Sequence, residues 1–393
     1  MFRKINQCDV FVGMWCIYMS QEILYSPGII NQLLQLIMLS WGIIALLKYI
    51  VQATESSTIL KVTLMLIAMY TIYGTIHIMF DEPIKGQSTY YYLQSALNSL
   101  APIFLFYDFA KNGKLTSGRI RIYLPILIVT CILLYYKTEN QILLQKDAEE
   151  VTNNAGYFFV SLIPFLFFYS KRPILQFAFL VVILLYVFMG MKRGAILIGA
   201  VGTMILLYSN LKNSSRKIKF LFAILTTVII VGISKYIDYM MSHSEYFMLR
   251  YEQTLEGQTS GRDAIYGSLW HTLLSEPAPL YFYLGRGAES TLRIIGKFAH
   301  QDWLETFCNN GIIGVIILFV FFYTFGKNIW KSKLYFSRMM FFSFVTLFII
   351  TFCKTLFSMS IQNLDLSITM LIGYFAFELH NFEHNDIIDE TDN

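Results

Sequence analysis

Long apolar stretches recur along the whole chain and constrain its fold more than any other feature. A helix needs about 20 apolar residues to cross a hydrocarbon core of about 30 Å, where backbone groups find no water. Of the 393 residues, 56% are hydrophobic and 14% are charged, and the mean hydropathy is +0.54. These values exclude a soluble globular protein. Because the alternating pattern of a β-barrel is absent, the sequence predicts an all-α integral membrane protein.

Twelve apolar runs approach the length of a membrane-spanning helix, which predicts about twelve transmembrane helices in a single polytopic domain, 1–393. Polar and aromatic residues follow the first run where a leader would be cleaved, so that run is predicted to be retained. The predicted spans are 9–23, 30–51, 60–80, 90–107, 120–136, 156–169, 173–189, 194–208, 218–233, 311–325, 340–358 and 366–377.

Lysine and arginine collect in alternate loops, which predicts the orientation of the chain. The basic face is expected to be the cytoplasmic side of the membrane, with both termini and an acidic tail, 380–393, on that side. A polar stretch, 235–308, then forms one large extracytoplasmic loop with short amphipathic helices. The basic segments are Arg3 and Lys4, residues 111–121, Lys171 and Arg172, residues 212–219, and residues 327–338.

One pair of cations departs from this charge pattern. Lys192 and Arg193 lie in a tight turn on the predicted outer face, where short loops normally carry few positive charges. Either these side chains extend toward lipid headgroups, or they hold an anion at the outer surface.

Two arginines in the large loop are candidates for binding an anion. Ser260 and Asp263 have capping-box spacing, which predicts a helix with Arg262 in its first turn. The N–H groups of a helix start and a guanidinium both suit phosphate, although an exposed arginine near a cap is the alternative. Arg286 stands between two glycines, which permit positive φ angles and close backbone approach.

His300 precedes a run that leads directly into the tenth span. Trp303, Leu304 and Phe307 predict a short amphipathic helix at the membrane surface, and Gly311 predicts a break before the span. His300 is therefore expected at the depth where a side chain meets a lipid-linked headgroup.

Histidine titrates near neutrality, so His300 is a candidate proton acceptor. The carboxylates of Asp302 and Glu305 are predicted to orient its ring or to bind substrate. A structural histidine is the alternative, and the roles of His243 and His271 in the same loop stay open. The sequence has no P-loop, no dinucleotide-binding glycine motif, no H-E-x-x-H and no G-x-S-x-G, which disfavours nucleotide, zinc and covalent serine chemistry.

Four fragments, taken in order, resemble the Wzy/O-antigen ligase superfamily of membrane glycosyltransferases. They are K-R-G-A-I-L at 192–197, S-G-R-D-A-I-Y at 260–266, L-G-R-G at 284–287, and H-Q-D-W-L-E with N-G-I-I-G within 300–314. Many members have asparagine directly after the histidine, whereas this chain has Gln301, so the role of that position stays open. The resemblance implies catalytic roles for Arg193, Arg262 and His300. The predicted substrate-binding residues are Lys192, Arg286, Asp302 and Glu305.

The implied function is polymerisation of undecaprenyl-diphosphate-linked oligosaccharide repeat units for a surface polysaccharide, capsule or O-antigen. A glycan would pass from the lipid diphosphate to a sugar hydroxyl, with no metal and no nucleotide cofactor. The expected partners are the lipid-linked oligosaccharide and membrane lipid, with a chain-length regulator as a further candidate and no nucleic acid. Two alternatives remain: an O-antigen ligase acting on lipid A core, and a transporter or flippase, which twelve spans fit equally well. Sugar identity, linkage and oligomeric state are left open.

Overall fold

The chain is all-helical in the part that the structure describes, as the apolar runs predict. This structure is a computed structural model. Each of the twelve predicted spans coincides with a helical segment, and the seventh matches α7 to the residue. The described residues are 4–21, 23–24, 28–52, 57–84, 87–144, 154–190, 192–213, 216–243, 248, 252, 262–275 and 278–391.

The helices fall into two groups around the region of the large loop. Those before it are α1 Gln7–Met19, α2 Ile29–Val51, α3 Thr58–Phe80, α4 Tyr91–Lys111, α5 Ser117–Leu144, α6 Ala155–Val160, the 3-10 helix η1 Ile163–Tyr169, α7 Pro173–Met189, α8 Arg193–Asn213 and α9 Arg216–His243. Those within and after it are α11 Arg262–Ser275, α12 Pro279–Leu284, α13 Ser290–Ile295, α14 Asp302–Tyr335, α15 Arg338–Phe357 and α16 Leu366–Thr391.

Six helices in the described part of the chain are long and apolar enough to cross a membrane: α2, α3, α5, α8, α14 and α15. The segment formed by α6 and η1 is apolar but shorter, and so is α7. Several such helices in one chain make this a multi-pass membrane protein. The length and hydropathy of the helices support six of the twelve predicted spans, so the number twelve stays a prediction.

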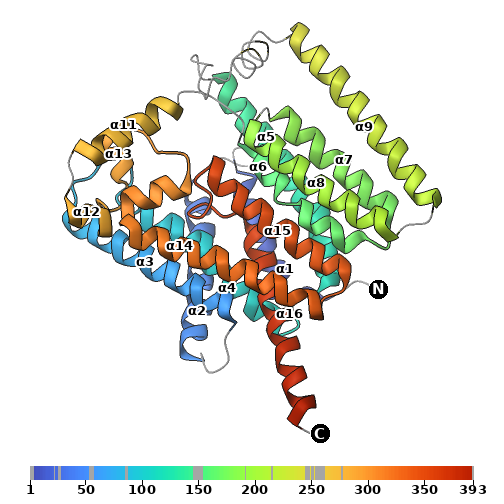
Figure 1. Cartoon of the computed structure of the whole chain (residues 1–393), viewed down its shortest axis with the longest axis horizontal. Helices are drawn as coiled ribbons and strands as arrows, with labels where there is room; N and C mark the ends of the chain where they lie inside the picture. The colour runs from blue at the N-terminus through green and yellow to red at the C-terminus, as the bar shows by residue number, and fades with distance from the viewer. Residues whose placement is uncertain are drawn as a thin grey trace.

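The centre of the bundle is α4, which packs against α2, α3 and α16 (Figure 1). The closest approach is at Gly373 of α16, where a Cβ atom would lie 2.5 Å from the carbonyl oxygen of Ile103. Glycine is required there because any side chain would push the two helices apart. Beside this contact, Phe104, Phe106 and Phe109 are fully buried.

Three short helices, α11, α12 and α13, gather at one end of the molecule, which we call the loop end (Figure 1, orange). Helices α3 and α15 end there, and α8 and α14 begin there. The polar stretch begins later than predicted, because α9 continues to His243. The helix that begins at Asp302 is the short helix that was predicted before the break at Gly311. The predicted tail is also helical, since α16 extends to Thr391.

Candidate functional site

Arg262 is the first residue of α11, in agreement with its predicted position in a first helical turn. Its Nη2 donates a 3.1 Å hydrogen bond to the carbonyl oxygen of Phe357, the last residue of α15. The final carbonyls of a helix carry a partial negative charge, so this bond holds the guanidinium at the end of α15. The predicted cap residue Ser260 lies outside the described residues.

The unexpected pair of cations lies at the beginning of α8, which starts at Arg193. The next residue, Gly194, packs so tightly that a Cβ atom there would lie 2.3 Å from the hydroxyl of Tyr157 and 2.9 Å from Cβ of Phe357. Only glycine permits this approach. The start of α8 and the Arg262 side chain therefore meet at the same residue, Phe357.

His300 lies directly before α14, is accessible at the loop end and has a left-handed φ of 55°. The pKa of its imidazole is lowered by partial burial and, after that, by the positive charges of Lys192, Arg262 and Lys297. These cations come from the start of α8, the start of α11 and the turn after α13. We call His300 and these three cations the cationic site. The lowered pKa of His300 keeps its imidazole neutral and able to accept a proton near neutral pH.

The Leu-Gly-Arg-Gly motif interlocks with a break in α14. Gly285 and Gly287 have φ angles of 72° and 92°, and Gly311 has a φ of 63° inside α14. The N–H of Arg286 donates to the carbonyl oxygen of Cys308 at 2.8 Å, and the N–H of Gly287 donates to the following carbonyl at 3.1 Å. The predicted break at Gly311 is confirmed. The motif satisfies carbonyl groups that the break leaves without helical partners.

The Arg286 side chain links α11 to α12. Its Nη2 lies 3.5 Å from the carbonyl oxygen of Thr272, and its guanidinium carbon lies 4.7 Å from the centre of the Tyr281 ring. Arg286 is not among the cations that lower the pKa of His300. Its role in substrate binding stays a prediction.

Asp302 and Glu305 are buried and use their oxygens on protein groups. Asp302 accepts hydrogen bonds of 2.8 Å from both the N–H and the hydroxyl of Ser360. Glu305 accepts from the hydroxyl of Thr291 at 2.6 Å and from the N–H of the residue before His300 at 2.9 Å. Within the described part of the chain, neither carboxylate hydrogen-bonds the His300 ring, which differs from the prediction. Glu305 thus fixes the backbone beside the histidine, and Asp302 anchors the start of α14 to the segment between α15 and α16. Their role in substrate binding stays a prediction.

One member of the cationic site, Lys297, and one neighbour of it, Tyr157, were not found from the sequence. Lys297 acts on His300 electrostatically, although it belongs to no motif and only its position three residues earlier was a signal. Tyr157 contacts the start of α8, and the Lys354 ammonium lies 5.7 Å from the centre of its ring. Isolated residues of these types in apolar runs carry no sequence signature.

Among the described residues, His77 and His271 make no hydrogen bond with the cationic site. His77 is buried at the end of α3 with its Nδ1 2.8 Å from the carboxylate of Asp81, which also lies 2.6 Å from Nη2 of Arg293. This cluster ties α3 to α13. His271 is exposed on α11. The side chain of His243 lies outside the described residues, so its role stays open.

Comparison with known families gives a match over residues 178–320 to the family described as O-antigen ligase (Wzy_C). The match agrees with the resemblance of this part of the chain to the Wzy/O-antigen ligase superfamily. The matching segment runs from α7 into α14 and contains the cationic site together with Arg193, Arg286, Asp302 and Glu305. The match supports a membrane glycosyltransferase of the ligase or polymerase type. No curated protein matches the chain.

Proposed function

We propose that this protein polymerises undecaprenyl-diphosphate-linked oligosaccharide repeat units at the outer face of the bacterial cytoplasmic membrane. The observation that supports the proposal best is that the charges of Lys192 and Arg262, together with partial burial, lower the pKa of His300. A proton acceptor therefore lies near cations suited to a diphosphate. All three residues lie in the segment that matches the family.

The reaction exchanges one glycosidic bond for another. The oxygen of an acceptor sugar hydroxyl forms a bond to the anomeric carbon of the donor glycan, while the bond from that carbon to the diphosphate breaks. The lipid diphosphate leaves with the electron pair, and His300 takes the proton of the hydroxyl. Direct attack from the face opposite the leaving group inverts the configuration of the anomeric carbon.

The cations stabilise the leaving group. Negative charge on the diphosphate increases as the glycosidic bond breaks, so fixed positive charges lower the barrier more than they strengthen ground-state binding. Arg262 presents a planar fork of donors suited to phosphate oxygens. Lys192 and Arg193 contribute charge from the start of α8, where the partial positive charge of the helix dipole also favours an anion.

We expect the purified protein in liposomes to convert lipid-linked repeat units alone into a ladder of longer chains. Gel analysis of the radiolabelled glycan measures this directly. Product that forms only after lipid A core is added would instead assign the protein as an O-antigen ligase. Movement of the substrate across the bilayer without any new glycosidic bond would assign it as a transporter.

The acid side of the pH profile is a second prediction. His300 accepts a proton only when neutral, so kcat/KM should fall as the pH drops through its lowered pKa, below the usual value of 6.5. Lys192→Gln removes a positive charge that disfavours the protonated ring. The pKa of His300 then rises, and the acid limb should move to higher pH.

A matched control for this shift is Lys327→Gln, which removes an exposed lysine from the far part of α14. Its kcat/KM profile against pH should superimpose on that of the parent protein. An acid limb that stays in place in Lys192→Gln would contradict electrostatic coupling between Lys192 and the titrating group.

A further inference from the structure

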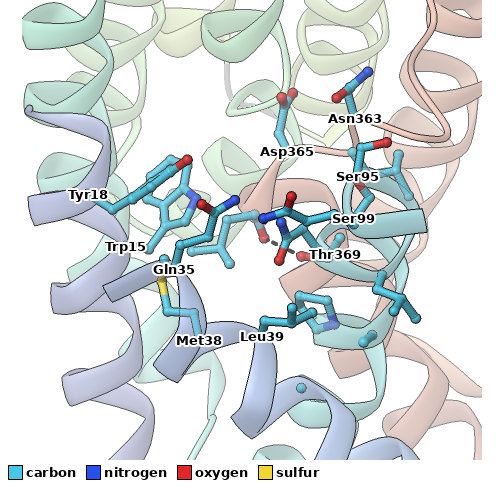
Figure 2. Close-up of a pocket in the computed structure, with 18 of the residues that line it drawn as sticks. Trp15, Tyr18, Gln35, Met38, Leu39, Ser95, Ser99, Asn363, Asp365 and Thr369 are labelled. Carbon is cyan, nitrogen blue, oxygen red and sulfur yellow. Dashed lines mark hydrogen bonds between the residues drawn. The ribbon is translucent and has the colours of Figure 1, made fainter. Parts of the chain in front are cut away.

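A partly open cavity lies among the helices of the bundle. Its lining residues all lie outside the segment that matches the family. It has a volume of about 320 Å³ and lies between α1, α2, α4 and the beginning of α16. We call it the polar cavity. Figure 2 shows Gln35 of α2 directed toward its centre, with Trp15 and Tyr18 of α1 on one side and Asp365 at the opposite edge.

Three amide side chains line the polar cavity without using their hydrogen-bonding groups on protein. They are Gln35 of α2 and Gln94 and Asn98 of α4, all half-buried. In the part of the chain that the structure describes, no protein group hydrogen-bonds any of these three amides. Because polar side chains in an apolar bundle favour polar partners, half-buried amides from two helices that face one space indicate a polar occupant.

The remaining lining residues define the chemistry of that occupant. Trp15 and Tyr18 offer aromatic surfaces to the space that the amides face. None of the described lining residues is lysine or arginine, whereas Asp365 contributes a carboxylate. This composition disfavours a phosphate and fits a neutral molecule with many hydroxyl groups and flat apolar faces, such as a sugar ring.

A series of contacts connects the polar cavity to the start of α8, beside Lys192 of the cationic site. Asp365 at the edge of the cavity accepts a hydrogen bond of 2.5 Å from Nζ of Lys354, and both groups are buried. The Lys354 ammonium lies 5.7 Å from the centre of the Tyr157 ring, whose hydroxyl meets α8 at Gly194. These contacts link the edge of the polar cavity to the helix start that carries Arg193.

We propose that the polar cavity binds a sugar unit of the lipid-linked oligosaccharide, a subsite that rests on the proposed glycosyltransferase function. The diphosphate is held by the cationic site, and the neutral part of a substrate occupies the cavity. The two spaces thus divide the substrate by charge. The amides of α2 and α4 select the sugar. The cations bind the diphosphate and do not distinguish one sugar from another.

The test uses two probes with the purified full-length protein. The first is the lipid-free repeat-unit oligosaccharide, released from its diphosphate by mild acid, and the second is inorganic pyrophosphate. We expect Gln35→Leu and Asn98→Leu each to weaken oligosaccharide binding about tenfold in calorimetry, because each removes a hydrogen-bonding partner. Both variants should bind pyrophosphate as the parent protein does. Gln32→Leu, which changes an exposed residue on α2, is the matched control.

Tryptophan fluorescence locates the bound oligosaccharide. Its emission change should disappear in Trp15→Phe and persist in Trp330→Phe, which alters an exposed tryptophan on α14. The subsite proposal is overturned if the parent protein does not bind the oligosaccharide. It is also overturned if Gln35→Leu and Asn98→Leu bind it as tightly as the parent does, and the cavity then holds water alone. A different result would contradict the proposed function itself. In that case pyrophosphate would not bind to the parent protein, or Arg262→Ala would bind it as tightly as the parent does.

Discussion

His300→Ala should reduce glycan transfer by about 10²–10⁴-fold, because the reaction loses the group that takes the proton of the acceptor hydroxyl. The lowered pKa of His300 is the physical basis: the ring is neutral at the pH where it is needed. The effect should fall on kcat at saturating substrate. Chain formation from lipid-linked repeat units by purified protein in liposomes measures it.

A histidine on the neighbouring helix provides the control for this prediction. His271 is exposed on α11, and His271→Ala should leave turnover within about twofold of the parent value, since exposed substitutions have small effects on stability. Donor binding to His300→Ala should remain close to normal, because the cations are unchanged. Equal loss of donor binding and turnover would assign His300 to binding and contradict its role as a base.

Arg262→Ala should lower kcat by about 10²–10³-fold, the usual cost of removing one fixed donor from developing negative charge. The loss should exceed the weakening of ground-state binding, because the diphosphate gains charge as the glycosidic bond breaks. Steady-state kcat and KM, determined separately with the lipid-linked donor, measure the two effects.

Arg262 also donates to the carbonyl oxygen of Phe357, so the thermal midpoint of the variant must be compared with that of the parent. Arg262→Lys keeps the charge without the fork and should recover part of the activity. Arg121→Ala removes an exposed arginine from α5 and should leave the kinetics unchanged. If Arg262→Ala folds and retains full kcat, Arg262 does not stabilise the leaving group.

The helices were predictable because hydropathy marks the apolar middle of each segment. The residues at which the helices begin and end were less predictable. Residues 218–233 were predicted for the helix that forms α9 Arg216–His243, which extends beyond both predicted limits. Polar turns can extend a helix when tertiary contacts satisfy their groups, and composition alone does not reveal those contacts.

The cationic site was predictable as a set of cations and a histidine, since Lys192, Arg262 and His300 stood in motifs. The tasks of Asp302 and Glu305 were not, because their carboxylates bind backbone and hydroxyl groups that only the folded chain brings near. The polar cavity left even less signal. Its amides are single polar residues within apolar runs, and their convergence depends on how α2 packs against α4.

The buried pair of Lys354 and Asp365 has a consequence for biosynthesis. A lone lysine costs about 2.5–3.5 kcal/mol at the centre of a membrane helix, and less toward its ends. Lys354 lies in the last turn of α15, and its carboxylate partner leaves the ribosome 11 residues later, at the start of α16. The charge of α15 is neutralised only when that partner arrives. The translocon is therefore expected to release these two helices into lipid together, as one hairpin.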